Sequence, residues 1–519
     1  MSNDFKKSMS WIHTWLGLIA GWILFTVFVT GTSSYYHHEI SSWMKPKLTQ
    51  SKVSENTPII AIGIANELAR DVANFSLSLP TQRQSTISIM YRDRDPDTKR
   101  RIKVFKEYDA ITAQEIIPRQ TAGGDFLFRF HFKLHGIPKF LGEWIVAIAT
   151  FCMFIAIITG VLIHKRIFKD IFVFRPEKRV RNWMDGHILP AVAAIPFLIM
   201  ITYSGLILSI KFMMPWAVES IYENPRVYNH EIRALNSNQK IKADKKANKK
   251  SELSEEKLIE IYKQANILWP NNIGGFQITR NKKTGLEVKF WQKDHNSIFY
   301  SKFEKKLLVF DGNTKKFKYE ASSPSSSSGV VVTQSTFDTL HRARFADSSM
   351  RFTFFLFGIL GTIVVATGLI LWNKKRQSKY ENKNHLGYKI VEKLNIGTII
   401  GMFIAIASYF IANRLIPLDI ENRAILEIKI FFITWLSSYI WAFLRNSKNA
   451  WNEQALFTSI LFIVLIFINA FTINNSIYEF IQRELLFYYF DLFFLLCAFM
   501  FFIIFKKTKI KTIGDNDVK

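Results

Sequence analysis

Cysteine is nearly absent from this 519-residue chain: the only two, Cys152 and Cys497, both lie inside long apolar runs. An exported disulfide, a CxxC redox motif and the thiolate ligands of an iron–sulfur cluster are therefore excluded. A glycine-rich GxGxxG turn after a strand is also missing, which argues against a flavin or nicotinamide site within the chain. Any metal chemistry must use the eleven histidines.

Acidic residues are also few, with 42 Asp and Glu against 68 Lys and Arg and a net charge of +26. Such an excess can indicate nucleic-acid binding. Here, however, much of the basic charge lies in short clusters beside apolar runs, where it marks the cytoplasmic loops of a membrane protein. We therefore predict no nucleic-acid partner.

Apolar residues, by contrast, are abundant at 49% of the chain, and aromatic residues make up 15%. Stretches of about 18 apolar residues or more are long enough to span a bilayer. Eight such stretches are centred near Leu24, Ala149, Ile199, Leu360, Phe403, Thr434, Ile463 and Leu496. The first continues to about Tyr36 without the break of a cleaved signal peptide, so we expect a retained helix. The sequence thus predicts a polytopic α-helical membrane protein.

Basic clusters give the orientation. They occur at Lys6 and Lys7, in segments 165–181 and 374–393, and near Arg445 and Lys506. All fall on one side, so we predict both termini in the cytoplasm of a bacterium and the chain in its inner membrane. The long connections 37–140 and 214–350 are then predicted to be periplasmic.

The predicted organisation follows from these runs. It consists of a first membrane helix at 1–36, a periplasmic domain at 37–140, a second helix at 141–164, a cytoplasmic loop at 165–185, a third helix at 186–213, a second periplasmic domain at 214–350, a fourth helix at 351–373, a cytoplasmic loop at 374–395, four additional helices at 396–506 and a cytoplasmic tail at 507–519.

The first seven tenths of the chain is internally duplicated. His13 is followed 17 residues later by Thr30-Gly31, and His187 by Ser204-Gly205 at the same spacing. Thr159-Gly160 on the second helix likewise matches Thr367-Gly368 on the fourth. Each exported segment has a helical stretch, strand-like alternation and a hairpin signal, Tyr108-Asp-Ala-Ile-Thr or Phe310-Asp-Gly-Asn-Thr. The predicted unit is helix, small α+β domain, helix, used twice.

Histidines collect at both ends of this duplicated core, where ionisable or metal-binding side chains are costly and often functional. The cytoplasmic level holds His13, His164 and His187; the outer level holds His37, His38, His131, His135 and His341. Small residues follow two of the inner histidines at helical spacing: Gly17, Ala20 and Gly21 after His13, and Ala191 and Ala194 after His187. A flat macrocycle held between helices needs such space, so we predict haem b bound by two imidazoles.

The pairing is partly open. His13 and His187 are predicted to bind the inner haem, although His164 could replace His13. His341 is predicted to bind the outer haem with either His131 or His135. Zinc is the alternative use of these side chains, but a structural zinc site needs four clustered ligands.

Several motifs resemble the PepSY-associated transmembrane family, in particular its iron-regulated siderophore-iron reductase branch. They are "HTWLGLIAGWILFTVFVTG", "FRFHFKLHG", "TGVLIHKRIFKDIFVFRPEK", "WMDGHILPAVAAIPFLIMITYSGL" and "LHRARFADSSMRFTFFLFGILGTIVVATGLILW", and together they cover residues 10–373. The resemblance implies PepSY-type α+β domains in the periplasm, two b-type haems and reduction of ferric siderophore iron. It favours His131, because the family pattern has leucine three residues later, here Leu134. The helices after Asn395 depart from the simplest members.

These observations predict a haem-dependent ferric-siderophore reductase for iron acquisition. The electrons would come from an external donor, either quinol or a cytoplasmic reductase, and membrane lipid surrounds the helices. The alternatives are a PepSY-type binding or regulatory protein and an iron or haem transporter, both without redox activity.

Overall fold

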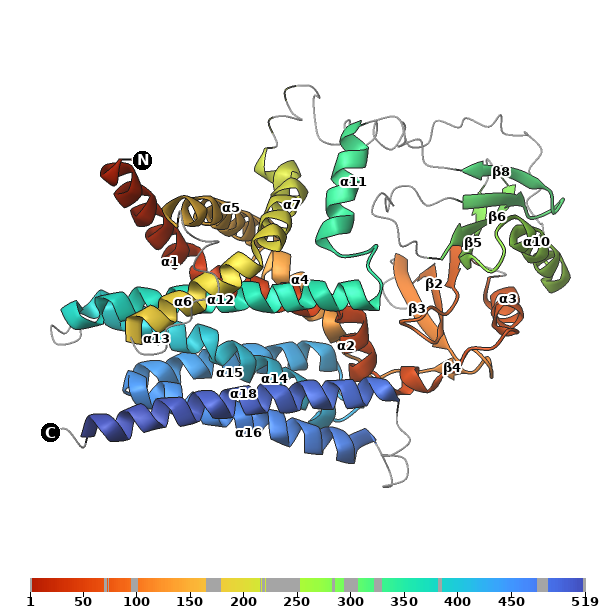
Figure 1. Ribbon diagram of the computed structural model, residues 1–519. Coiled ribbons are helices and arrows are strands. Elements are labelled where there is room, and N and C mark those ends of the chain that lie inside the picture. The colour runs from red at the N-terminus through yellow and green to blue at the C-terminus, as the bar shows by residue number, and fades with distance from the viewer. Residues whose placement is uncertain are drawn as a thin grey trace. The chain divides into compact units, whose positions relative to one another are not determined.

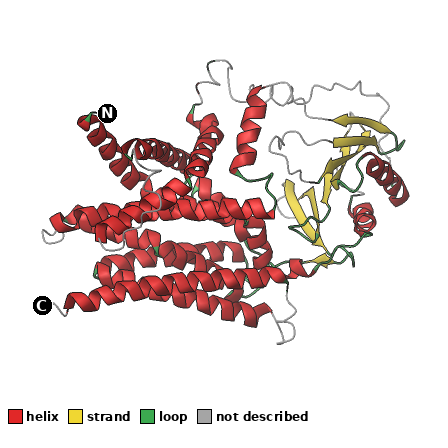
Figure 2. Cartoon of the chain, in the orientation of Figure 1, coloured by secondary structure: helices red, strands yellow, loops and turns green. Residues whose placement is uncertain are grey.

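The computed structural model describes residues 2–69, 72, 74–94, 101–164, 179–214, 216, 220, 253–281, 285–293, 307–321, 329–380, 385–473 and 484–516. The chain forms two compact units (Figure 1). The first comprises Met1–Met44, Gln120–Met213 and Ala346–Lys519, and the second comprises Lys45–Arg119 and Met214–Phe345. Figure 2 shows that the strands belong to the second unit and that helices make up the described part of the first.

The first unit contains the apolar helices. They are α1 (Asn3–Ser34), α2 (His37–Met44), α4 (Gly123–Lys133), α5 (Lys139–Ile163), α6 (Arg179–Ala193), α7 (Ile195–Met213), α12 (Ser348–Tyr380), α13 (Leu386–Ile399), α14 (Gly401–Leu415), α15 (Arg423–Leu444), α16 (Ser447–Ile473) and α18 (Leu485–Asn516). Seven of the described spans are long and apolar enough to cross a membrane, or eight if α6 and α7 count as one. The prediction of a polytopic α-helical membrane protein is confirmed.

The third predicted helix is broken. α6 and α7 meet at an angle of 71° around Ala194, whose side chain is fully buried. Pro190 lies inside α6 and Pro196 is the second residue of α7. Proline lacks the N–H that would continue the helical hydrogen bonds, which explains the break between them.

Two predicted loops are shorter than expected. α6 begins at Arg179 rather than at residue 186, while residues 165–178 lie outside the described ranges. α12 continues to Tyr380 and α13 begins at Leu386, so the predicted loop 374–395 is largely helical. Basic residues therefore continue helices here, because lysine and arginine are good helix formers.

Close helix packing builds the duplicated core. α1 packs against both α5 and α12, and α6 packs on α12. Glycines allow the approach of α12 to α1: an added Cβ at Gly358 would lie 2.4 Å from Thr32, and one at Gly361 would lie 2.4 Å from Phe28. Small residues commonly let membrane helices pack at such short separations.

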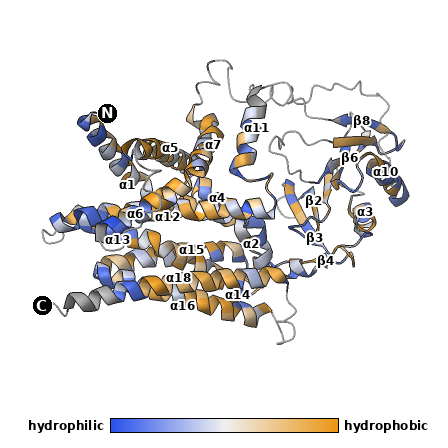
Figure 3. Cartoon of the chain, in the orientation of Figure 1, coloured by the Kyte–Doolittle hydropathy of each residue, from blue (hydrophilic) through white to orange (hydrophobic). Residues whose placement is uncertain are grey.

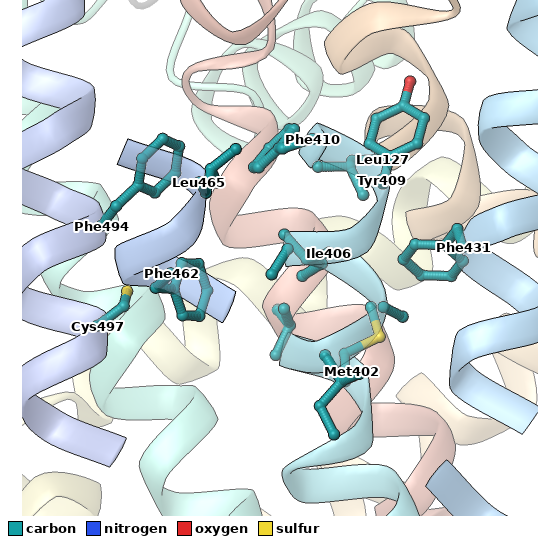
Figure 4. Packing of buried hydrophobic residues seen from close by; sticks show 14 of the residues in the cluster. Leu127, Met402, Ile406, Tyr409, Phe410, Phe431, Phe462, Leu465, Phe494 and Cys497 are labelled. Atoms are coloured by element: carbon teal, nitrogen blue, oxygen red, sulfur yellow. The ribbon is translucent and has the colours of Figure 1, made fainter. Parts of the chain in front are cut away.

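Helices α13 to α18 form what we call the appended block. Figure 3 shows α16 and α18 apolar along most of their described length. Its interior is aromatic, with Phe410, Phe431, Phe462 and Phe494 buried in one cluster (Figure 4). Helices α2 and α4 add Trp43, Phe126 and Phe130 to the same cluster. The block is thus packed against α2 and α4 of the first unit.

The second unit is built on one antiparallel sheet. Its strands are β1 (Asn74–Ser78), β2 (Ile87–Arg94), β3 (Arg101–Tyr108), β4 (Glu115–Ile116), β5 (Ile273–Asn281), β6 (Gly285–Gln292), β7 (Leu307–Asp311) and β8 (Phe317–Ala321), in the order β4-β3-β2-β1-β5-β6-β7-β8. Helices α3 (Thr57–Leu68) and α10 (Glu255–Leu268) share one hydrophobic core with it. A 3-10 helix (Pro46–Gln50) and α11 (Gly329–His341) complete the unit.

The two long segments that were predicted to be exported have the same element order, as the duplication predicts. Each contributes one helix followed by four strands, and β1 pairs with β5 from Asn74–Thr279 to Ser78–Gly275. The α+β prediction is confirmed, but the two halves share a single eight-stranded sheet. Joining them through β1 and β5 also protects two strand edges that would otherwise be exposed.

Candidate functional site

His13 lies against the second helix of the duplicated core. Its Nδ1 is 2.8 Å from the carbonyl oxygen of Ala156 and 3.4 Å from the Thr159 hydroxyl. Gly160 makes this contact possible, because an added Cβ there would lie 3.2 Å from His13 Cε1. One turn of α5 thus offers the imidazole a carbonyl and a hydroxyl as acceptors, and the glycine leaves room for the ring.

His187 makes the same set of contacts in the second repeat. Its Nδ1 is 2.9 Å from the carbonyl oxygen of Val364 and 3.3 Å from the Thr367 hydroxyl. An added Cβ at Gly368 would lie 3.1 Å from His187 Cε1. The matched Thr-Gly pairs found in the sequence are therefore the surfaces on which the two matched histidines rest.

The imidazoles of His13 and His187 lie close to each other in the first unit. Their ring centroids are 6.2 Å apart and their planes are inclined by 77°. Within the described residues, Nε2 of neither ring has a hydrogen-bond partner, whereas both Nδ1 atoms are bonded to backbone carbonyls. A carbonyl accepts only, so Nδ1 carries the proton and Nε2 keeps the lone pair that can bind a metal. Each ring therefore keeps one nitrogen that can bind a metal ion, and the two rings lie close together.

His131 makes a similar contact with α1. Its Nδ1 is 2.7 Å from the carbonyl oxygen of Val27, and an added Cβ at Gly31 would lie 2.5 Å from its ring. Thr30-Gly31 is the pair that the duplication aligns with Ser204-Gly205. Three histidines therefore rest on glycines that follow a threonine.

The neighbouring histidines are placed differently. His135 stacks on Phe432 of α15, with ring centroids 5.3 Å apart, and its ring contacts Phe126 rather than α1. His37 and His38 stack on each other at 3.9 Å, and His37 Nδ1 is 2.9 Å from the carbonyl oxygen of Ser34. Of the two alternatives left open by the sequence, only His131 has the contacts shared by His13 and His187.

The remaining two candidates are His164 and His341. His164 caps the C-terminus of α5, and its backbone N–H donates to Gly160 O. His341 is the last residue of α11, in the second unit. Among the described residues, no group of three or more His, Cys, Asp or Glu is placed to hold a metal ion.

The predicted strips of small residues are only partly available to a ligand. An added Cβ at Gly21 would lie 2.6 Å from Leu369, and Ala20 and Ala194 are buried among apolar side chains. At Gly17, an added Cβ would meet no atom within 4 Å in the described part of the chain. The strips mainly allow helices to pack closely, and the glycines that contact the imidazoles lie on the facing helices.

Sequence reasoning missed a buried polar network in the appended block. Arg423 pairs with Glu427, and both side chains are fully buried. Arg414 Nε donates to Asn469 at 3.0 Å, and Asn469 Nδ2 donates to Asp491 at 3.2 Å. The signal was present: ionisable residues within or beside apolar runs are rare and deserve a functional or structural explanation.

The network also binds the backbone at the two points where the chain leaves and re-enters the first unit. Arg414 Nη2 donates to the carbonyl of Trp43 at 2.6 Å, and Arg423 Nη1 donates to that of Gln120 at 2.8 Å. Tyr409 donates to the carbonyl of Gly123 at 3.0 Å. The appended block thus fixes α2 and the start of α4, the helix that carries His131.

The comparisons with known proteins agree with this architecture. A family model described as "PepSY-associated TM region" matches residues 10–375, more than half of the chain. Comparison with curated proteins gives no match. The match covers most of the duplicated core, from α1 to α12, and both long segments that connect its helices. The chain therefore belongs to the family of proteins with a PepSY-associated transmembrane region.

Proposed function

We propose that this membrane protein is an oxidoreductase that passes electrons across the bacterial inner membrane to reduce ferric siderophore iron in the periplasm. His13 and His187 would hold one haem b near the cytoplasmic side. The observation that carries the proposal is their proximity: two imidazoles from α1 and α6, each hydrogen-bonded through Nδ1, have ring centroids 6.2 Å apart.

The spacing of this pair would allow both imidazoles to bind one metal ion. A ligand nitrogen lies about 2 Å from a metal ion and the ring centroid about 1 Å further back, so opposed imidazoles on one ion have centroids about 6 Å apart. The observed separation agrees with this value. Haem fits the donor set better than zinc, because haem itself supplies the four equatorial ligands that zinc would require from the protein.

Two further observations support a ligand at this level. The buried Nε1 of Trp372 has no hydrogen-bond partner among the described residues. Trp372 follows Gly368 by four residues and so lies on the same face of α12 as the surface beneath His187. The Arg376 guanidinium lies 4.1 Å from the Trp372 ring centroid. A donor and a cation at this place suit the carboxylates of a porphyrin.

For the outer haem, we propose His131 as one ligand; its pairing with His341 stays a prediction from the sequence, because His341 belongs to the second unit. His131 shares with the inner pair an Nδ1 contact to a backbone carbonyl and a close glycine, and the duplication of the sequence makes His341 its counterpart. His135 is disfavoured because its ring is stacked on Phe432. His164 is a less suitable inner ligand because no helix turn of the Thr-Gly kind supports it in the described structure.

Bound haem supplies reversible one-electron chemistry. The residues of the chain would bind it, hold a proton on each Nδ1 and exclude water with apolar helices. No dinucleotide motif is present, so the donor is external, either quinol or a cytoplasmic reductase. The acceptor would be ferric siderophore in the periplasm, where reduction weakens binding because ferrous iron suits hard oxygen ligands less well. Both termini are proposed to be cytoplasmic.

The visible spectrum of the purified protein tests the proposal. We expect bis-imidazole haem bands, sharpened by dithionite, with about two haems per chain. His187→Ala and His131→Ala should each lose about one haem, whereas the matched variants His164→Ala and His135→Ala should keep both. A well-folded, haem-supplied protein without Soret absorption would refute the proposal and favour a binding or regulatory role instead.

A further inference from the structure

Four helix turns in the first unit have the same local structure. In each, a Thr or Ser precedes a glycine, and its hydroxyl donates to the carbonyls three and four residues earlier. The bonds are Thr159 to Ala156 and Ile155 (3.1 and 2.8 Å), Thr367 to Val364 and Ile363 (3.1 and 2.6 Å), Thr30 to Val27 and Thr26 (3.4 and 2.6 Å), and Ser204 to Ile201 and Met200 (3.1 and 2.6 Å).

Ser and Thr hydroxyls in helices commonly donate to a carbonyl of the preceding turn, so these bonds alone would not indicate a function. The unusual feature here is that a histidine contacts the same helix turn in three of the four cases. The carbonyl three residues before the threonine also receives Nδ1 of His13, His187 or His131, at 2.8, 2.9 and 2.7 Å. Ordinary back-bonded threonines on the same helices, Thr150 on α5 and Thr362 on α12, have no such imidazole contact in the described structure.

The direction of these bonds follows from the hydroxyl proton. Because the Thr159 hydroxyl donates to backbone carbonyls, it can only accept from His13, whose Nδ1 lies 3.4 Å away. The Thr367 hydroxyl has the same relation to His187 at 3.3 Å. Each imidazole therefore meets two acceptors at Nδ1, a carbonyl and a hydroxyl, and one tautomer is strongly favoured.

We propose that Thr159 and Thr367 are positioning residues that hold the Nδ1 proton of His13 and His187 and thereby tune these imidazoles as iron ligands. This inference rests on the proposed haem function. An imidazole that donates from Nδ1 is a more basic ligand at Nε2, and such supporting bonds change metal affinity by about 10- to 100-fold. They also change the potential of the bound iron.

The test uses Thr367→Val, which keeps the shape of the side chain and removes the hydroxyl, and Thr367→Ser, which restores it. Thr362→Val is the matched control on α12, because Thr362 is back-bonded to Gly358 at 2.9 Å but bears no histidine. Thr159→Val and its control Thr150→Val repeat the comparison on α5. The measurements are the midpoint potential of each haem, the electron paramagnetic resonance of the ferric protein and the haem-to-protein ratio.

We expect Thr367→Val to raise the midpoint potential of one haem, shift its ferric resonance signal and weaken haem retention about 10-fold. Thr367→Ser should return all three readouts toward wild type, and the controls should match wild type. Unchanged potentials and signals in both Thr→Val variants would overturn the inference, as would equal losses in Thr362→Val. A wild-type protein without haem would instead show that the proposed function is wrong.

Discussion

The duplicated core and the appended block both bury polar groups among apolar helices, but they do so in different ways. In the core, His13 and His187 are bonded at Nδ1, and Nε2 has no partner among the described residues. In the block, two arginines and two carboxylates are joined by amides into one network. Imidazoles that are hydrogen-bonded at Nδ1 only are suited to binding a ligand at Nε2. Two arginines balanced by two carboxylates are suited to holding helices together.

This difference indicates that the duplicated core is suited to binding a ligand and that the appended block stabilises the helices. Arg414 and Arg423 donate hydrogen bonds to the backbone carbonyls of Trp43 and Gln120. These two residues lie where the chain leaves and re-enters the first unit. Asn413 links the two arginines, since its Oδ1 accepts from Arg414 at 2.9 Å and its Nδ2 donates to Glu427 at 2.9 Å. The block therefore supports α4, and through α4 the position of His131.

Breaking the buried ion pair should have the largest effect. Glu427→Ala leaves the Arg423 charge without its partner in a fully buried site, and such a change costs about 3–5 kcal/mol. We expect the thermal unfolding midpoint in detergent to fall markedly. The double variant Arg423→Met/Glu427→Leu should be less damaging than Glu427→Ala, because it removes both charges.

The matched control for this experiment lies in the same block. Arg445 and Glu453 also pair, but their side chains are 51% and 28% exposed, so Glu453→Ala should cost about 0–1 kcal/mol. If Glu427→Ala and Glu453→Ala destabilise the protein equally, the network is not the support described above.

Adding a methyl group at the glycines under the histidines should have an intermediate, graded effect. Gly31→Ala would place Cβ 2.5 Å from His131, Gly160→Ala would place it 3.2 Å from His13, and Gly17→Ala would meet no described atom within 4 Å. Overpacking typically costs about 1–3 kcal/mol. We expect Gly31→Ala to displace His131 and lower haem content most, Gly160→Ala to do so less, and Gly17→Ala to resemble wild type.

Haem content and the ferric resonance spectrum measure this series. The order matters more than any single value, because the three substitutions are chemically identical and differ only in the distance to an imidazole. A loss in Gly17→Ala equal to that in Gly31→Ala would show that the effect comes from helix propensity rather than from contact with the ring.

The sequence predicts the repeated features better than the unique ones. The Thr-Gly pairs and the histidines could be found because each occurs twice at fixed spacing, so chance resemblance is less plausible. The carbonyl acceptors could not, since a backbone oxygen has no signature in the sequence. The network of Arg414 and Asp491 was missed because its members come from separate helices and meet only through tertiary packing.

The same reasoning explains two errors of organisation. Each exported segment was predicted as its own domain, but β1 and β5 pair edge to edge, and an edge that will be paired looks like any other strand in the sequence. The third span was predicted as one helix because its apolar run is continuous. Pro190 and Pro196 signalled the break, but the size of its angle, 71°, could not be predicted from them.

The smallest expected effect tests whether the two exported halves remain equivalent. Asp109 accepts backbone N–H bonds from Ile111 and Thr112 at 2.9 and 2.7 Å, and Asp311 accepts them from Asn313 and Thr314 at 2.9 and 3.0 Å. Burial raises the pKa of each carboxyl, but the N–H bonds outweigh burial, and both pKa values fall below the ordinary 3.8.

Because the folded pKa is lowered, each carboxylate contributes stability that is present above pH 3.8 and is lost as the pH falls through the folded value. Asn keeps one acceptor oxygen but no charge, so Asp109→Asn and Asp311→Asn should each cost a similar amount near pH 7, about 0.5–1.5 kcal/mol. Both should also reduce the loss of thermal stability between neutral and acid pH. Asp419→Asn, in the loop between α14 and α15, is the control. Unequal effects of the two hairpin variants would mean that the copies, although alike in backbone, no longer contribute equally to the shared sheet.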